Sequence, residues 1–222
     1  MTNSKSTKRA LIISVLAIFM CVAMLIGTTF AWFTDTASTG VNKIQAGNLD
    51  VKLMYSTDMQ TWKEATEQTK LFDDNALWEP GYTQVVYLKV VNAGNLALKY
   101  ETGFSKDYTS NRGKNVNGDW YRVDNYLKIG TAETTTKFAN REDVWSAISA
   151  TEKTLAKDVM LTDGWITLNA KEESAPFAVA IYMPTSVGNE ANASRLRPSS
   201  VSGLGIEVRA TQATVESDSF DN

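Results

Sequence analysis

Residues 82–92 read Tyr-Thr-Gln-Val-Val-Tyr-Leu-Lys-Val-Val-Asn, the most strongly β-forming run in the chain. β-Branched and aromatic side chains fill this run, and apolar residues occupy nearly both of its alternating faces, as in a central strand. Residues 92–95, Asn-Ala-Gly-Asn, have the composition of a tight turn. Leu96–Phe104 follows, with Leu, Leu, Tyr, Thr and Phe at every second position. We therefore predict a β-hairpin that joins residues 82–92 to residues 96–104.

Shorter β signals continue on both sides of this predicted hairpin. Six further strands or strand pieces are expected at residues 48–55, 59–64, 120–129, 165–168, 176–183 and 202–216. The apolar period becomes helical only across residues 140–160, where Asn140 can cap the first turn of a helix. The sequence therefore predicts a mainly β domain, a jelly-roll or immunoglobulin-like sandwich with one inserted helix.

The composition argues against several classes of function. The chain of 222 residues contains no histidine, which removes HExxH zinc sites and Ser-His-Asp triads. Lys and Arg number 22 against 25 Asp and Glu, so the net charge is −3, whereas a nucleic-acid binder carries a basic face. We therefore expect no catalytic residues, no metal, no cofactor and no nucleic-acid partner.

The amino terminus has the pattern of an export signal. Basic residues at positions 5, 8 and 9 precede an apolar run, Ala10–Ile26, and small residues stand at positions 29 and 31. A signal peptidase admits small side chains there, so we expect cleavage between Ala31 and Trp32. The run of 17 residues is slightly longer than a usual secretory core, so a retained membrane anchor stays open as the alternative.

Cleavage after Ala31 would leave a mature chain without cysteine. Cys21 is the only cysteine and lies within the apolar run, where we interpret it as a small hydrophobic residue. Lys and Arg fall from 22 to 19 on cleavage while Asp and Glu stay at 25, so the mature net charge is −6. The predicted organisation is a signal peptide at 1–31, an extended segment at 32–46, a β-sandwich domain at 47–216 and a disordered tail at 217–222.

Several short motifs together resemble the TasA/camelysin family of exported proteins. The signature lies in Thr28–Asp35, Thr-Thr-Phe-Ala-Trp-Phe-Thr-Asp, followed by Gln45–Asp50, Gln-Ala-Gly-Asn-Leu-Asp. Glu79–Gly81 and Val91–Lys99 are similar to the family's P-G…N-x-G-x-L-x-x-K block. Ala210–Ala213, Ala-Thr-Gln-Ala, is similar to its closing strand. Residues 105–200 match no family pattern.

The resemblance implies a jelly-roll-like sandwich that is exported and processed by a dedicated SipW-type signal peptidase. It further implies assembly into fibres of a biofilm matrix or cell surface of a Gram-positive bacterium. Self-association, or association with related matrix proteins, follows from that role, and membrane contact is expected only through an uncleaved signal. Camelysin is described as a cell-surface metalloprotease, but a chain without histidine gives no reason to expect that activity here.

The segment at 32–46 is the candidate for an assembly element. Its apolar residues Trp32, Phe33, Val41 and Ile44 stand among Thr, Asp, Ser and Asn, so it can act as a donor strand for the sheet edge of a neighbouring subunit. The alternative is a first strand folded back on its own domain. The same strand can be held by its own domain in a monomer and exchanged in a filament.

Two other groups of residues could bind a ligand or could serve only the structure of the domain. Asp73–Asn75 and Asp218–Asp221 are rich in oxygen ligands, but neither has the spacing of a calcium loop, so solvated turns are expected. Four aromatic residues lie near a polar loop: Tyr108, Trp120, Tyr121 and Tyr126. They could stack on a carbohydrate or peptide, or pack within the domain, and we expect packing.

Three functional hypotheses follow, in order of preference. The first is a non-enzymatic structural protein that forms, or accompanies, an extracellular fibre by β-strand addition. The second is a monomeric, adhesin-like surface module that binds a glycan or a host protein. The third is an exported hydrolase, which without histidine would depend on paired carboxylates, and no such pair can be identified from the sequence.

Overall fold

The computed structural model describes residues 14–20, 34–38, 49–105 and 108–213. The chain divides into two compact units, Met1–Phe33 and Thr34–Asn222. In the first unit, residues 14–20 are helical and exposed. No helix among the described residues is both long enough and apolar enough to cross a membrane. The second unit is mainly β, and all its paired strands are antiparallel, which confirms the expected class of fold.

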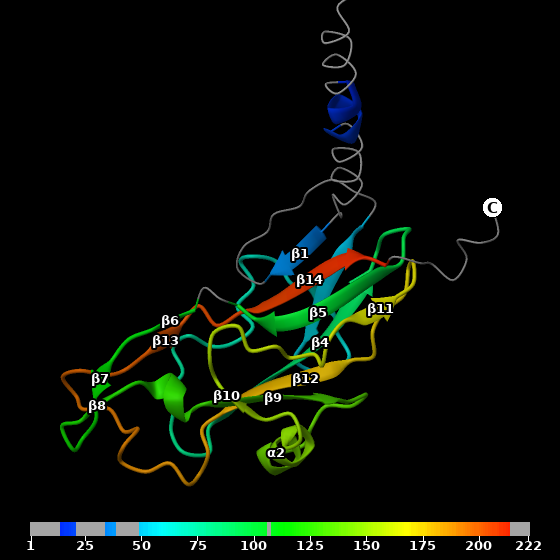
Figure 1. The fold of residues 1–222 in the computed structure, drawn as a ribbon. Coiled ribbons are helices and arrows are strands. Elements are labelled where there is room, and N and C mark those ends of the chain that lie inside the picture. The colour runs from blue at the N-terminus through cyan, green and yellow to red at the C-terminus, as the bar shows by residue number, and fades with distance from the viewer. Residues whose placement is uncertain (1–13, 21–33, 39–48, 106–107, 214–222) are drawn as a thin grey trace, which may run out of the picture. The chain divides into compact units, whose positions relative to one another are not determined.

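Two larger sheets form the body of the second unit (Figure 1). The six-stranded sheet has the order β10 (Lys153–Thr154), β9 (Lys128–Glu133), β12 (Phe177–Tyr182), β4 (Thr83–Asn92), β2 (Val51–Ser56) and β3 (Lys63–Glu64). The four-stranded sheet has the order β1 (Thr34–Ser38), β14 (Ile206–Gln212), β5 (Leu98–Phe104) and β11 (Ile166–Leu168). Two small pairs, β13 (Val201–Ser202) with β6 (Thr109–Ser110) and β7 (Gly113–Lys114) with β8 (Trp120–Tyr121), lie at one end.

One apolar core lies between the two sheets, as in a β-sandwich. Apolar side chains at every second position of β4, β5 and β14 enter it, and those at most 2 % exposed are Val86, Leu88, Val90, Leu98, Tyr100, Phe104, Ile206, Val208 and Ala210. The alternation predicted for Leu96–Phe104 is therefore confirmed, and residues 206–210 alternate in the same way within the strand expected at 202–216. Burial of each large aliphatic side chain contributes about 1.5–3 kcal/mol, so this face-to-face contact is the main source of stability.

The predicted hairpin between residues 82–92 and 96–104 is wrong. β4 pairs with β2 and β12 in the six-stranded sheet, whereas β5 pairs with β14 and β11 in the four-stranded sheet. The strands themselves were located correctly, but residues 92–95 carry the chain from one sheet to the other. Both strands have strongly apolar faces, and packing them against each other across the core buries more apolar surface than pairing them edge to edge.

The side chain of Asn92 holds this crossing in place. It is fully buried, and its amide nitrogen donates to the carbonyl oxygens of Leu96 at 2.8 Å and Asn169 at 2.9 Å. Its amide oxygen accepts a hydrogen bond from the backbone nitrogen of Gly94 at 3.0 Å. Its own backbone nitrogen donates to the carbonyl oxygen of Glu172 at 2.9 Å. One amide therefore joins the end of β4 to the turn and to the segment after β11.

The inserted helix is shorter than predicted. α2 spans Arg141–Ile148, and the Asn140 side chain accepts a hydrogen bond from the Asp143 nitrogen at 2.9 Å, so the predicted cap is confirmed. The expected extension to residue 160 is absent, because residues 153–154 pair with β9 and Leu155 joins the main core. The helical spacing across residues 140–160 arose from two segments that face different cores.

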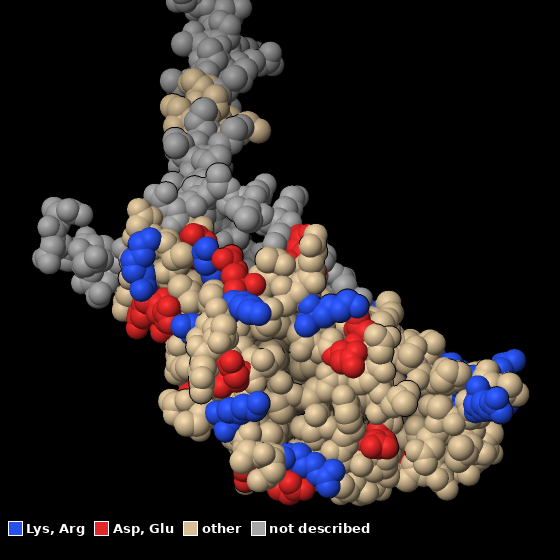
Figure 2. Space-filling view, turned by 180° about the vertical axis from the view of Figure 1, so that it is seen from behind, with Lys and Arg blue, Asp and Glu red and all other residues tan. Residues whose placement is uncertain are grey.

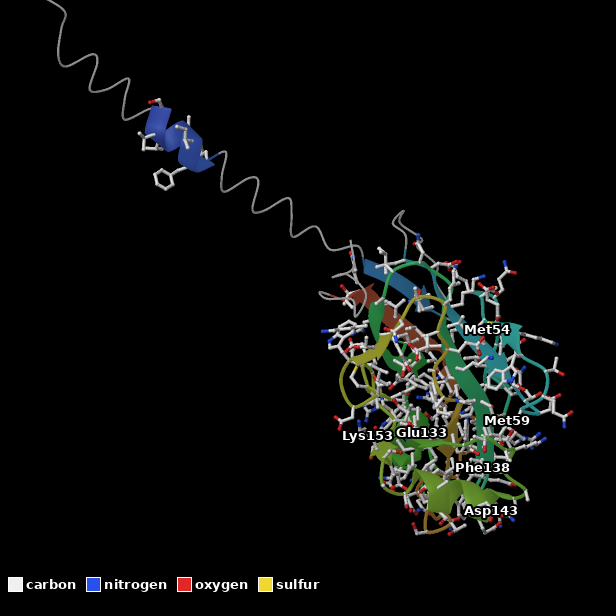
Figure 3. The ribbon with its side chains drawn as sticks, turned by 90° about the vertical axis from the view of Figure 1, so that its right-hand side faces the viewer. Met54, Met59, Glu133, Phe138, Asp143 and Lys153 are labelled. Carbon is white, nitrogen blue, oxygen red and sulfur yellow. The ribbon has the colours of Figure 1, made fainter. Side chains whose placement is uncertain are left out.

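A second, smaller core lies under α2, on the outer face of the six-stranded sheet (Figure 3). Ile148 of α2 packs with Ala180 and Tyr182 of β12, and the indole of Trp145 stacks on the Tyr182 ring at 5.2 Å. β12 is therefore buried on both faces. The strand expected at residues 120–129 is divided, because a 3₁₀ turn at Val123–Tyr126 separates β8 from β9.

Replacing Asn92 with Ala should lower the free energy of unfolding by about 2–4 kcal/mol, because several buried backbone groups would lose their partner. Chemical denaturation measures the effect. Asn95→Ala is the matched control, since Asn95 belongs to the same turn and is exposed, and it should change stability by less than about 0.5 kcal/mol. Equal effects of the two substitutions would contradict the role given to Asn92.

Candidate functional site

The four outer edges of the two main sheets are closed in two different ways. Three of them end in strands of only two or three residues, namely β3, β10 and β11. Short edge strands of this kind offer little backbone for pairing with another chain. The fourth edge is closed by β1, which has five residues and covers the seven-residue strand β14. This edge is the candidate site of assembly.

β1 pairs antiparallel with β14 along its whole length. The register runs from Thr34 opposite Thr211 to Ser38 opposite Glu207. On its other side β14 pairs with β5 over seven positions, from Ile206 opposite Phe104 to Gln212 opposite Leu98. Withdrawal of β1 would therefore leave a seven-residue edge strand anchored to the core, with its outer backbone groups unpaired.

The predicted donor segment is only partly described. The cleavage residues Ala31 and Trp32 and the other expected donor residues, Phe33, Val41 and Ile44, lie outside the described residues. The described portion, Thr34–Ser38, pairs with its own domain, as in the fold-back alternative. Its sequence, Thr-Asp-Thr-Ala-Ser, has no apolar alternation of its own, so the strand expected in this segment rested on the apolar residues that flank these five.

Charged side chains of β14 and β5 form ion pairs beside β1. Arg209 of β14, which stands opposite Thr36, approaches the carboxylates of Glu207 at 3.3 Å and Glu101 at 3.6 Å. The hydrogen bond to Glu207 is the main reason why the pKa of Arg209 is raised above its ordinary value. Glu207 and Arg209 lie on the partly exposed face of β14. Their ion pairs involve side chains and leave the backbone edge of β14 to pair with β1.

A cleft of about 800 Å³ lies between strands of the two main sheets, near α2. Its walls include the apolar side chains of Tyr100 and Phe177 and the carboxylates of Glu133 and Asp163. Burial raises the pKa of the Tyr100 hydroxyl.

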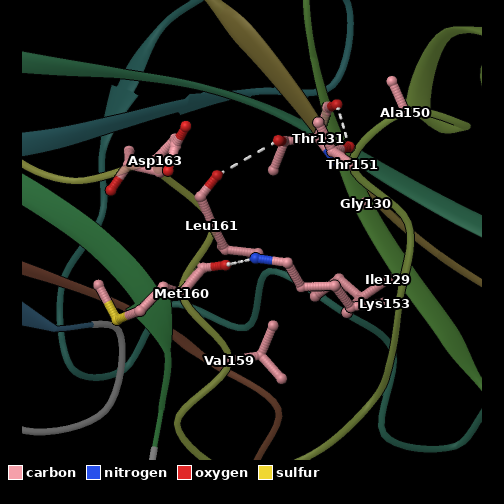
Figure 4. Close-up of a pocket in the computed structure, with 11 residues that line it drawn as sticks. Ile129, Gly130, Thr131, Ala150, Thr151, Lys153, Val159, Met160, Leu161 and Asp163 are labelled. Carbon is pink, nitrogen blue, oxygen red and sulfur yellow. Dashed lines mark hydrogen bonds between the residues drawn. The ribbon is translucent and has the colours of Figure 1, made fainter.

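A smaller cavity of about 300 Å³ shares part of this wall (Figure 4). Its polar side chains bond to the backbone. Lys153 donates to the Met160 carbonyl at 2.9 Å, and Thr131 donates to the Leu161 carbonyl at 3.3 Å. Thr151 donates to the Thr131 carbonyl at 2.6 Å. The two threonine bonds fasten the 150–163 segment to β9, and the Lys153 bond closes that segment on itself, so all three have a structural role.

The oxygen-rich residues of the described chain form turns. Asp73 accepts a hydrogen bond from the Asn75 nitrogen at 2.9 Å, and Asp74 pairs with Lys70 at 3.1 Å. Within the described ranges, no group of three or more Cys, Asp or Glu residues is arranged to hold a metal ion. The second acidic group, Asp218–Asp221, lies outside those ranges.

The four candidate aromatic residues separate into packed and exposed. Tyr108 is 2 % exposed and meets the Phe104 ring edge-on at 6.1 Å. Tyr121 is also buried and lies 6.4 Å from the ring of Tyr126. Packing, the expected interpretation, is confirmed for these three. Trp120 differs, because it is 49 % exposed.

Comparison with known proteins gives no relative: no protein-family model, no curated protein and no solved structure matches this chain.

Stability should decline as the pH rises above about 10. Burial raises the pKa of Tyr100 and of Tyr108 above the ordinary value of 10.0, so both keep their protons in the folded state after an unfolded chain would lose them. Their contribution is complete below pH 10 and is lost as the pH climbs through the folded-state pKa. Melting temperatures measured from pH 7 to pH 11 test this.

The variant Tyr100→Phe/Tyr108→Phe should show a shallower decline above pH 10 than the parent protein. At pH 7 all these hydroxyls are protonated, so the difference between variant and parent at that pH gives the baseline. Parallel curves for the two proteins up to pH 11 would contradict the prediction.

Proposed function

We propose that this chain is an exported, non-enzymatic structural protein, a subunit or accessory of an extracellular fibre that assembles by β-strand addition. In this proposal it is a jelly-roll-like member of the TasA/camelysin kind, cut by a SipW-type signal peptidase and delivered to the matrix or surface of a Gram-positive bacterium. It requires no cofactor. The proposal rests on the signal block of the sequence together with one observation of the fold.

That observation is the closure of β14 by β1. β1 is the first strand of the second unit, and residues 39–50 connect it to β2. Twelve residues can span at most about 40 Å. β1 can therefore reach the β14 edge of an adjacent subunit while its own domain stays folded around the main core.

Exchange of β1 between subunits would cost little free energy. The same backbone pairs, Thr34 with Thr211 through Ser38 with Glu207, form whether β1 belongs to the same chain or to the next one. The donated strand of each subunit fills the edge left open by the previous donation. Such a head-to-tail interface repeats without closing, and that is the geometry of a filament.

Processing by the dedicated peptidase is the first test. The protein secreted by cells that contain the SipW-type enzyme should begin at Trp32 and form filaments in negative-stain micrographs. Cells without the enzyme should retain the intact amino terminus in the membrane fraction. A mature start with single particles only would refute the fibre role, and an intact start in wild-type cells would refute cleavage.

Locking β1 to its own domain is the second test. Thr36 and Arg209 are register partners, and neighbouring antiparallel strands lie close enough for a disulfide. The variant Thr36→Cys/Arg209→Cys should stay monomeric when oxidised, because β1 cannot leave β14, and should assemble after reduction. Size-exclusion chromatography and microscopy measure both states.

Each single substitution, Thr36→Cys or Arg209→Cys, is a matched control and should assemble under both conditions. Filaments formed equally by the oxidised double variant would show that β1 stays in place during assembly.

A further inference from the structure

Three cationic side chains converge on one exposed tryptophan. The guanidinium carbon of Arg112 and the ammonium nitrogen of Lys114 each lie 5.3 Å from the centroid of the Trp120 ring. The guanidinium carbon of Arg197 lies 5.6 Å from the same centroid. These distances are within the range of cation–π attraction. We call Trp120 with these three residues the basic cluster.

The backbone fixes the basic cluster in place. Trp120 and Lys114 belong to the β7–β8 pair, and the Lys114 nitrogen donates to the Arg197 carbonyl at 2.8 Å. The Lys114 carbonyl accepts a hydrogen bond from the Ser194 nitrogen at 2.7 Å. Gly113 permits this contact, because a Cβ there would lie 2.2 Å from the Ser199 nitrogen. These bonds fix the backbone of the two segments against each other, so their cations lie on one surface.

In the part of the chain that the structure describes, no carboxylate pairs with these cations. Among the described residues, no ion pair includes Arg112, Lys114 or Arg197, although the chain has 25 acidic residues against 22 basic ones. Figure 2 shows basic side chains gathered at the end of the domain that bears β7 and β8. Like charges held around one ring repel each other, and a bound anion would relieve that repulsion.

We propose that the basic cluster is a binding site for an acidic polysaccharide, in which the three cations hold anionic groups and the exposed indole contacts a sugar ring. Guanidinium groups bind carboxylates through paired hydrogen bonds, and an indole offers apolar surface together with a polar edge. None of the four residues of the basic cluster belongs to β1 or β14, so the proposal is independent of fibre assembly.

Two other anionic partners fit the site less well. Nucleic-acid binders present basic footprints on domains of high isoelectric point, whereas this chain has a sequence pI of about 5.1. An anionic bilayer would accept the exposed Leu196, but Asp119 is exposed in the β7–β8 turn and would bring a negative charge to the contact. A flexible soluble polymer can contact the cations while it avoids Asp119, whereas a flat bilayer would bring its anionic surface against both.

Isothermal titration calorimetry with the full chain in a nonionic detergent tests the proposal. The probe is a polygalacturonate oligomer, and neutral dextran of equal size is the comparison. We expect binding to polygalacturonate alone, weakened by about tenfold or more in Arg112→Gln/Arg197→Gln. Trp120→Ala should weaken it as well, with the fold of each variant checked by circular dichroism.

The matched control is Lys63→Gln/Lys137→Gln, which removes the same charge from exposed positions outside the basic cluster and should keep the parental affinity. Equal losses in the two double variants would show general charge attraction and overturn the site. No binding of polygalacturonate would also overturn it. Equal or tighter binding of polyglutamate, a single-stranded DNA oligomer or vesicles of anionic lipid would overturn the assignment of a polysaccharide.

Discussion

The buried amide of Asn92 is the constraint on which the arrangement of the two sheets depends. Its hydrogen bonds to the Leu96 and Asn169 carbonyls fix the point at which the chain leaves the six-stranded sheet and enters the four-stranded one. An unpaired buried amide is costly, so the side chain, the turn and the segment after β11 can adopt few other arrangements together. β4 and β5 consequently face each other across the core.

This crossing also determines how the four-stranded sheet ends. With β5 placed in that sheet, β14 pairs on one side of it and the short β11 on the other, so the outer side of β14 is free for β1. Among the described strands, β1 is the first in the chain, and it closes the main-sheet edge that a strand of two or three residues does not protect. Our proposal of assembly by strand exchange depends on that single closure.

The sequence predicted strand positions and buried faces well, because alternation is a local property that one strand carries by itself. Leu98, Tyr100 and Phe104 are examples. The sequence failed where contacts between distant segments determine the structure. Residues 92–95 have the composition of a hairpin turn, and only the buried partners of Asn92 show that the chain crosses between sheets there. The predicted helix ran past Ile148 because Leu155 and Val159, which continue its spacing, pack into the other core. Around Trp120, only the fold brings Arg197 to the hairpin that carries Arg112 and Lys114.

The most direct measurement of strand exchange uses two populations of mature chain, one carrying Thr36→Cys and the other Arg209→Cys. The chains are mixed, assembled into filaments and oxidised, and the products are separated on a non-reducing gel. Exchange of β1 predicts covalent dimers that join the two populations in filaments and are absent from the monomer fraction. Filaments without such dimers would contradict the account, because β1 would then remain paired with its own β14.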